Sequence, residues 1–443
     1  LAYAVIAFGH IGLWVLFWNH VEGSGRRKEV RKIQRYFAMA CVLGLPLWFA
    51  TQSGWPGDAL WWENTWTLNQ HGVAAYAIIC CYITLAVTPY AIVGRYIATR
   101  PKCQRIVRTK RHSVENNREQ APNQTKFDRF LLNFPGNQSL EIELATKCLE
   151  LEKLPRHLDA LTIAHISDLH VTGKIGRDFF EKIVDLTNEQ SPDLVAITGD
   201  LIDVEEYMSW LPATLGRLKS RHGIYFVLGN HDVKVDVQKL RRTLENVGLR
   251  DIASTWQKLS INNCNLIIAG NEQPWLGSNP DMSECPRSEN QFRLLLAHTP
   301  DLLPWARTND FDLMLAGHTH NGQICPPVTG PIFCPSRAPL PLVAGTVHLP
   351  PTVMHVSRGL SAEKPIRINS CPELAILHLV CPPANVNQQI EQDIQIKEPH
   401  HVEMHHQIEN RRKTRPLHQS PRAYPNDNDG DVEISRHEEI SRT

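Results

Sequence analysis

Five short polar motifs between residues 168 and 320 carry side chains that could bind metal ions. Each motif follows an apolar run with the composition of a buried strand. The seven candidate ligands are Asp168, His170, Asp200, Asn230, His298, His318 and His320. Oxygen and nitrogen ligands without a thiolate suit ions such as Mn, Fe or Zn better than Ca or Mg alone. There are enough ligands for two ions that share one carboxylate.

Two neighbouring metal ions could hydrolyse a phosphoester. Ions about 3.5–4 Å apart can bind phosphoryl oxygens, lower the pKa of a bridging water and stabilise in-line displacement. His231 follows Asn230 and is not needed as a ligand, so we expect it to protonate the leaving oxygen. Asp203 is the carboxylate expected to orient His231. Five such motifs in order, each after an apolar run, predict a metal-dependent phosphoesterase.

Alternating strands and helices must position these motifs. The strands are expected at 161–166, 194–198, 224–228, 293–297 and 313–316, and two further strand-like runs lie at 352–357 and 374–380. Helices are expected at 177–190 and at 236–248. A period-two pattern between Leu140 and Leu151 predicts a hairpin that opens the domain. This order of elements indicates an α/β domain with its polar groups at the carboxyl ends of the strands.

The ordered motifs resemble the signature of the calcineurin-like metallophosphoesterases. The matching segments are Asp168-x-His170, Gly199-Asp200-x-x-Asp203, Gly229-Asn230-His231-Asp232, His298 and Gly317-His318-x-His320. The resemblance covers about residues 140–381 and implies a two-sheet β-sandwich flanked by helices. It also implies one ion held by Asp168, His170, Asp200 and His320, and another held by Asp200, Asn230, His298 and His318. Asp200 would then bridge the two ions, and His231 would be the acid.

Longer segments are similar to a bacterial membrane-associated subgroup of that family. They are residues 166–170, 317–324 and 356–360. The subgroup includes an enzyme that cleaves the pyrophosphate of UDP-2,3-diacylglucosamine. Within the last segment, Arg358 could clamp a substrate phosphate, or it could be the partner in a structural ion pair. Both alternatives stay open at this point.

Three apolar runs precede the domain and predict transmembrane helices at 1–18, 36–50 and 72–93. The second run is short and contains Pro46, so it is a marginal span. The stretch 51–70 has four tryptophans and no Lys or Arg, which is typical of an interfacial loop. Basic clusters follow the first and third runs, and two crossings between them would put both clusters in the cytoplasm. The alternative is that the runs are buried core helices.

These features divide the chain into four parts. We expect a transmembrane segment at 1–112, a linker at 113–137, the catalytic domain at 138–381 and a disordered polar, His-containing tail at 382–443. The sequence begins at Leu1, so the number of spans is a minimum. The 46 basic and 46 acidic residues give no global attraction to nucleic acid, and none is predicted as a partner. The 11 scattered cysteines favour reduced thiols.

The leading hypothesis is a multi-pass membrane protein with a cytoplasmic catalytic domain. It would use two metal ions to hydrolyse a phosphoester or pyrophosphate. A membrane location favours a lipid-linked or amphiphilic substrate, while a soluble nucleotide or phosphoprotein stays open. The alternative is a non-catalytic membrane scaffold or regulator that retains the metallophosphoesterase fold. Its expected mark is the loss of a metal ligand, and every ligand position is present.

Overall fold

The computed structural model describes most of the chain. The described residues are 2–22, 28–53, 68–98, 103–115, 121–285, 287, 291–327, 330–331, 333–338 and 342–382. The expected disordered tail, from residue 383 onward, and the tryptophans of the expected interfacial loop lie outside these ranges. All eleven cysteines are thiols, as the sequence predicted.

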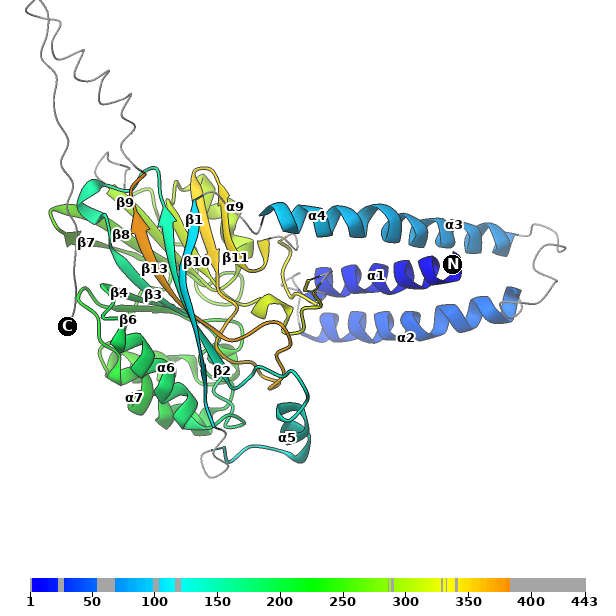
Figure 1. Cartoon of the computed structure of the whole chain (residues 1–443), viewed down its shortest axis with the longest axis horizontal. Helices are drawn as coiled ribbons and strands as arrows, with labels where there is room; N and C mark the ends of the chain where they lie inside the picture. Colours follow the sequence, from blue (N-terminus) through cyan, green and yellow to red (C-terminus); the bar gives the residue numbers. More distant parts are fainter. Residues whose placement is uncertain are drawn as a thin grey trace, which may run out of the picture. The chain divides into compact units, whose positions relative to one another are not determined.

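Two mixed β-sheets organise the described part of the domain (Figure 1). The first sheet has the order β1 (Gln104–Ser113), β2 (Glu141–Glu150), β13 (Glu373–Val380), β3 (Thr162–Ile166), β4 (Leu194–Thr198), β5 (Ile224–Val227) and β6 (Arg250–Asp251). The second has the order β11 (Gly345–Leu349), β12 (Thr352–Val356), β10 (Leu313–Ala316), β9 (Gln291–Ala297), β8 (Cys264–Asn271) and β7 (Trp256–Ile261). The predicted α/β fold with two sheets is confirmed.

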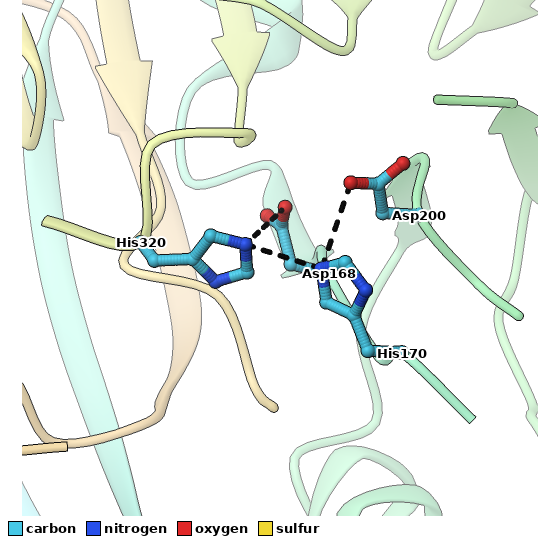
Figure 2. A group of neighbouring side chains, drawn as sticks. All are labelled: Asp168, His170, Asp200 and His320. Carbon is cyan, nitrogen blue, oxygen red and sulfur yellow. Dashed lines mark hydrogen bonds and ion pairs between the residues drawn. The ribbon is translucent and has the colours of Figure 1, made fainter. Parts of the chain in front are cut away.

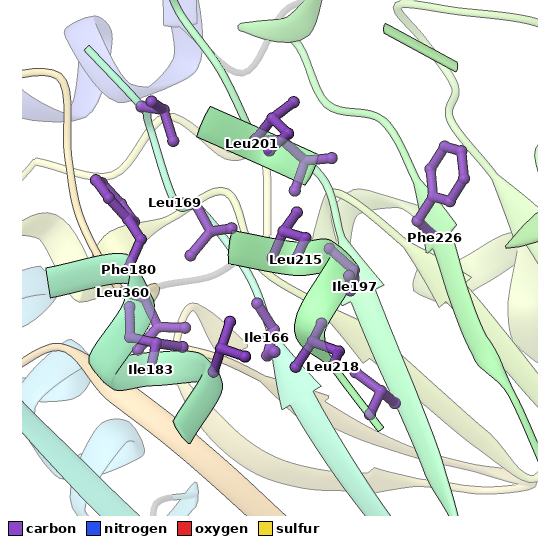
Figure 3. Packing of buried hydrophobic residues seen from close by; sticks show 14 of the residues in the cluster. Ile166, Leu169, Phe180, Ile183, Ile197, Leu201, Leu215, Leu218, Phe226 and Leu360 are labelled. Carbon is purple, nitrogen blue, oxygen red and sulfur yellow. The ribbon is translucent and has the colours of Figure 1, made fainter. Parts of the chain in front are cut away.

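Three apolar clusters hold the layers together. One joins the first sheet to the helices α6 (Arg177–Glu189), α7 (Trp210–Thr214) and α8 (Val237–Glu245), and Figure 3 shows Phe180 and Ile183 packed near Ile166 and Ile197. The second cluster fills the space between the sheets, and the third joins the second sheet to α9 (Leu303–Thr308). Fully burying one large apolar side chain contributes about 1.5–3 kcal/mol, so these clusters fix the strand ends firmly.

The two helices expected from sequence are present. In α6, Phe179, Phe180, Ile183 and Val184 are buried, which is the apolar stripe that predicted the helix. Asp236 caps α8 by accepting a hydrogen bond from the Lys239 backbone N–H at 3.0 Å. Each helix connects two neighbouring parallel strands and covers one face of the first sheet.

The strands that precede the polar motifs are divided between the two sheets. Strands β3, β4 and β5 are parallel neighbours in the first sheet, and β9 and β10 are parallel neighbours in the second. Because the carboxyl ends of parallel neighbours lie at the same edge, each sheet brings its own motifs together. The two sets meet where these edges of the sandwich adjoin.

The expected start of the domain needs correction. Residues 104–113, assigned above to the transmembrane segment and linker, form β1, and part of the expected linker forms α5 (Lys126–Leu132). The expected hairpin within 140–151 is instead the single strand β2, which pairs with β1 and β13. The apolar alternation is weak in β1 because it is an edge strand rich in exposed basic residues, which hid it from the sequence pattern.

The N-terminal part is helical, with α1 (Ala2–Glu22), α2 (Lys28–Ser53) and a continuous run of α3 (Leu68–Tyr82), a π-helical turn (Ile83–Val87) and α4 (Thr88–Ala98). Among the described residues, two stretches are long and apolar enough to cross a membrane, 4–21 and 72–94. The marginal run at 36–50 lies in α2 and does not reach that length and composition, because basic residues fill the first two turns.

One buried histidine ties the N-terminal helices together. His10 Nδ1 lies 2.7 Å from the hydroxyl of Tyr76, and its Nε2 lies 3.0 Å from the carbonyl oxygen of Val42. The three residues belong to α1, α3 and α2. Polar contacts of this kind stabilise the packing of apolar helices, so His10 has a structural role here.

Candidate metal centre

Six of the seven predicted ligands fall into two buried groups that share one residue. The first group is Asp168, His170, Asp200 and His320, and the second is Asp200, His298 and His318. Within each group the potential ligand atoms lie within 4.8 Å of one another. We call these residues together with Asn230 the metal cluster.

Figure 2 shows the first group converging from three strand ends. His320 Nε2 lies 3.5 Å from Asp168 Oδ1 and 3.1 Å from His170 Nε2. His170 Nε2 lies 3.5 Å from Asp200 Oδ2. All four side chains are almost fully buried, and their ligand atoms point to one small volume.

The second group also contacts Asp200. His298 Nε2 is 3.2 Å from Asp200 Oδ2 and 3.0 Å from Asn230 Oδ1. His318 Nδ1 is 3.1 Å from the same His298 nitrogen. Asn230, the seventh predicted ligand, is therefore in place beside this group, and Asp200 reaches both groups.

Glycines allow the strand ends to approach so closely. A Cβ atom on Gly229 would overlap Asp200 Oδ1 and lie 2.7 Å from His298 Cε1. A Cβ atom on Gly317 would overlap the Ser167 hydroxyl and Asp168 Oδ2. Each glycine precedes a predicted ligand, so the motif glycines are explained by space for the cluster.

Hydrogen bonds fix the orientation of three of the predicted ligand histidines. His298 Nδ1 donates to the Thr198 carbonyl at 2.7 Å, His318 Nε2 donates to the Pro335 carbonyl at 2.7 Å, and His170 Nδ1 donates to Asp203 Oδ2 at 2.7 Å. Because one ring nitrogen donates a proton to an oxygen, the other nitrogen presents a lone pair to the cluster. This is the arrangement that a metal-binding imidazole requires.

The backbone at the cluster is strained. Asp168, His170, Asp200, His318 and His320 all have positive φ angles, between 43° and 71°. This conformation is uncommon for residues other than glycine and costs about 1–2 kcal/mol per residue. Strain at five of the seven candidate ligands indicates that the fold holds them for a function.

The charges of the cluster fit the binding of cations. Burial raises the pKa of the Asp168 carboxyl above its usual value, so its charged form is costly without a compensating cation. Burial would lower the pKa of His298, but the Asp200 carboxylate raises it to about 9. A proton on His298 would thus supply charge that a metal ion could supply instead. Burial lowers the pKa of His318 to about 3, which keeps that imidazole neutral as a ligand must be.

The predicted acid and its partner lie at the rim. His231 is about one-fifth exposed, and its Nδ1 forms a short hydrogen bond with Asp203 Oδ1. The other oxygen of Asp203 accepts from the ligand His170, so one carboxylate orients both imidazoles. Burial would raise the pKa of Asp203, but the hydrogen bonds from His170 and His231 hold it well below its usual value.

Two charged residues at this rim had no sequence signal. Lys234 Nζ lies 2.6 Å from Asp203 Oδ1, 2.7 Å from His231 Nδ1 and 3.1 Å from Glu363 Oε2. Burial would lower the pKa of Lys234, but Asp203 and Glu363 raise it above its usual value. Lys234 follows His231 by three residues, and only the turn after β5 brings the two side chains together.

Arg358 is engaged by two acidic side chains. Its guanidinium forms ion pairs with Glu143 and with Glu373, the latter at 3.3 Å. These contacts favour the structural alternative over a phosphate clamp. A second arginine, Arg367, is fully buried and its Nη2 lies 2.9 Å from the Nδ1 atom of His320. Arg367 was not singled out from the sequence, because it follows no strand motif.

Comparison with known proteins identifies the family. The model of the calcineurin-like phosphoesterases matches residues 161–322. Phosphodiesterase YaeI of Escherichia coli (strain K12) is 30% identical over 224 residues, which cover 49% of this chain and 82% of the relative. The uncharacterized metallophosphoesterase YkuE of Bacillus subtilis (strain 168) is 29% identical over 249 residues, which cover 54% of this chain and 85% of the relative. The chain therefore belongs to the calcineurin-like phosphoesterase family.

One vertebrate relative is named as a transmembrane protein. The transmembrane protein with metallophosphoesterase domain of Danio rerio is 30% identical over 206 residues, which cover 42% of this chain and 47% of that protein. The match thus spans about half of the relative's length. Family membership and the buried Asp and His cluster support a metal-dependent phosphoester hydrolase. The two apolar stretches, together with relatives of this name, favour membrane association.

Proposed function

We propose that this protein is a membrane-anchored phosphodiesterase that uses two metal ions. The single observation that carries the proposal is the pair of buried acid and imidazole groups that share Asp200. The E. coli relative is named a phosphodiesterase, which favours diesters over monoesters. A pyrophosphate bond, which also joins two substituted phosphates, belongs to the same substrate class and is included in the proposal.

Asp168, His170, Asp200 and His320 would hold one ion, and Asp200, Asn230, His298 and His318 would hold the other. When bound, the ions would supply charge for the phosphoryl oxygens and a water of lowered pKa. Mn, Fe and Zn suit this set of oxygen and nitrogen ligands, which contains no thiolate. Asp203 and the carbonyls of Thr198 and Pro335 hold the imidazoles in the orientation that this binding requires.

His231 is the proposed acid for the leaving oxygen. Its Nδ1 is hydrogen-bonded to Asp203, so its Nε2 is the nitrogen available to a substrate. Its backbone N–H donates to Asp200 Oδ1 at 2.7 Å, which ties the position of His231 to the shared carboxylate. The side chain is partly exposed, as a group that meets a substrate must be.

The apolar stretches 4–21 and 72–94 are the proposed membrane anchor. Basic residues after residue 94, including those of β1, would remain on the cytoplasmic side with the catalytic domain. A catalytic domain at a membrane surface favours an amphiphilic substrate, and this is the substrate class that we propose.

The test is hydrolysis of bis(p-nitrophenyl) phosphate by the full chain reconstituted with Mn²⁺. We expect turnover that EDTA abolishes and Mn²⁺ restores. Asp200→Asn should remove turnover, and His231→Ala should lower kcat by about 10²- to 10⁴-fold, the usual contribution of a general acid. Circular dichroism should show that both variants are folded.

The outcome separates enzyme from scaffold. Turnover by Asp200→Asn at the rate of the unsubstituted protein would contradict the proposal, because the shared carboxylate would then be dispensable. Absence of turnover by the Mn²⁺-loaded protein against diesters, monoesters and pyrophosphates alike would favour the non-catalytic alternative. The p-nitrophenyl esters test the chemistry without assuming a natural substrate.

A further inference from the structure

A second feature of the domain lies beside the metal cluster. It is a pocket of about 580 Å³. Its wall combines residues from the segments after β8 and β9, from α9 and from the end of β11, together with Arg337, Ala338 and Leu342. The volume lies in the range of small-molecule binding sites. None of the predicted ligands lines this pocket, so it is distinct from the metal cluster.

The pocket and the metal cluster are connected along the chain. Thr299 lines the pocket and directly follows the ligand His298. Pro274 also lines it and precedes Trp275, whose ring centroid is 4.9 Å from that of His318 and 5.6 Å from that of His298. Two residues that line the pocket are thus direct chain neighbours of residues at the metal cluster.

The pocket is predominantly aliphatic. Leu302, Leu342 and Leu349 line it, and each is only partly buried at the outer edge of the third apolar cluster. Its carboxylate, Asp301, is occupied by the Ser336 hydroxyl at 2.6 Å and by the backbone N–H groups of Arg337 and Ala338 at 3.0 Å. A strongly polar ligand would find few partners here, whereas an alkyl chain would bury apolar surface.

Cationic side chains lie at the edge of the pocket. Arg307 and Arg337 line it and are both exposed. The Arg307 Nε donates to the Pro350 carbonyl at 3.0 Å, which holds its guanidinium at the pocket. Positive charge around an aliphatic wall complements a ligand that joins an alkyl chain to an anionic phosphate.

The loop that forms one wall of the pocket also contacts the N-terminal helices. The Cys334 backbone N–H donates to Asn19 Oδ1 at 2.9 Å, and the rings of Trp18 and Phe333 lie 6.4 Å apart. Trp18 and Asn19 belong to the apolar stretch 4–21 of α1. The wall is thus attached to a candidate membrane helix, and this contact favours a substrate that comes from a lipid surface.

We propose that this pocket binds the alkyl or acyl chain of a phosphodiester whose phosphate is cleaved at the metal cluster. The inference rests on the proposed function and names its substrate class. Leu302, Leu342 and Leu349 are the specificity-determining residues. A diester with only a short substituent would leave the pocket empty, so contacts in the pocket would not strengthen its binding.

The experiment compares two chromogenic diesters, methyl p-nitrophenyl phosphate and octyl p-nitrophenyl phosphate. The Mn²⁺-loaded full chain is studied in lipid nanodiscs, and kcat/KM is measured for both substrates. The reported quantity is the ratio of the octyl value to the methyl value, because it cancels changes in metal loading or protein folding. Leu302→Trp and Leu349→Trp each fill the pocket from a different element, so one variant suffices if the other fails to fold. The matched control is Leu259→Trp, a partly buried position on β7 at the opposite edge of the same sheet.

We expect the unsubstituted protein to prefer the octyl diester. Each pocket variant should lower the octyl-to-methyl ratio by at least about tenfold, which is the usual range for lost apolar contacts in a substrate pocket. Leu259→Trp should leave the ratio within about twofold, because Leu259 does not line the pocket. A ratio unchanged in both pocket variants, with the methyl diester still hydrolysed, would overturn the pocket assignment alone. No hydrolysis of either diester would overturn the proposed function as well.

Discussion

Two buried polar clusters in this domain differ in how their charge is balanced. In the metal cluster, Asp168 and Asp200 contact histidines and backbone N–H groups, and among the described residues no Lys or Arg forms an ion pair with either carboxylate. The second cluster lies in the first sheet and its neighbouring strands. We call it the interior ion-pair cluster, and it comprises Lys147, Glu373, Arg358, Glu143 and His355.

The interior ion-pair cluster is complete in itself. Lys147 Nζ lies 2.5 Å from Glu373 Oε1 and 3.0 Å from His355 Nε2, and Arg358 pairs with both glutamates. Lys147 and Arg358 balance its two carboxylates, and Arg111 adds an ion pair to Glu143 at 3.2 Å, so no further ion is needed. The metal cluster has carboxylates without such partners, and buried charge of this kind is retained where an external cation binds. The comparison separates acids that are balanced by Lys and Arg from acids whose neighbours are histidines and backbone N–H groups.

The largest expected effect is a loss of activity on substitution in the metal cluster. Asp168→Asn keeps an oxygen that can accept from the His318 backbone N–H, now at 3.0 Å, but it removes a charged ligand. We expect metal-dependent turnover to fall by more than about 100-fold. This loss exceeds the one that is typical when a residue that only orients a metal ligand is replaced. In EDTA the melting temperature should not fall, because burial already disfavours the Asp168 charge. Calorimetry in EDTA and diester assays with Mn²⁺ measure the two effects.

The second-largest expected effect is a loss of stability on substitution in the interior ion-pair cluster. Glu373→Gln leaves Lys147 and Arg358 buried with one carboxylate fewer, and breaking such a pair costs about 3–5 kcal/mol. We expect the free energy of unfolding to fall by that amount at pH 7 in urea titrations. The kcat of the folded protein should change by less than about threefold, since Glu373 contacts none of the ligands. A large loss of kcat without a loss of stability would contradict the comparison.

The same variant has an expected pH dependence. Burial would raise the pKa of Glu373, but the charges of Arg358 and Lys147 hold it well below its usual value. A carboxyl with a lowered pKa in the folded state stabilises the protein above its unfolded pKa, which is about 4.3. This stability is lost as the pH falls below that value. The difference between the unsubstituted protein and Glu373→Gln should therefore be constant above about pH 5 and shrink below about pH 4.

A smaller loss of activity is expected for substitution of Asp203, whose carboxylate orients His170 and His231. Asp203→Asn would weaken the hydrogen bonds that orient His170 and His231. We expect a loss of about 10- to 100-fold in activity or in metal affinity, the usual range for a residue that orients a ligand. Titration with Mn²⁺ should show which of the two is lost. Equal activity and affinity in the variant would show that Asp203 orients neither imidazole.

The smallest effect concerns Lys234 at the partly exposed rim. Lys234→Met removes the contacts with Asp203 and Glu363, and an ion pair of this exposure contributes about 0.2–1 kcal/mol, which corresponds to about 1.4- to fivefold in rate. Lys239→Met removes the exposed pair with Glu205 away from the cluster and is the matched control. We expect a lower kcat/KM only for Lys234→Met. Identical kcat/KM values in both variants would show that Lys234 does not contribute to activity.

Much of the fold was predictable because its central strands and helices have strong local patterns. β3, β4, β5, β9 and β10 are short apolar runs that end at polar motifs, and α6 and α8 have clear apolar stripes. β1 was not predicted because it is exposed and basic. β7 was not predicted because three of its six residues are exposed. Edge strands owe their structure to pairing across the sheet, which a local pattern does not contain.

The candidate site was predictable for a different reason. Its seven proposed ligands sit directly after strands, so the motifs and the strand order together bring them to one place. Lys234, Glu363 and Arg367 reach the site through turns and through the segment after β12, and no local pattern marks them. The positive φ angles of Asp168 and His318 are only weakly indicated by residue type, since the packed fold selects which Asp and His residues adopt them.

The central claim is that one carboxylate, Asp200, joins two ion sites, and electron paramagnetic resonance of the Mn²⁺-loaded full chain tests it most directly. Two Mn²⁺ ions joined by a shared ligand interact magnetically and give the spectrum of a coupled pair. We predict a coupled spectrum at two Mn²⁺ per chain, which Asp200→Asn should convert to that of isolated ions. A spectrum of isolated Mn²⁺ at every ratio of metal to unsubstituted protein would contradict the account.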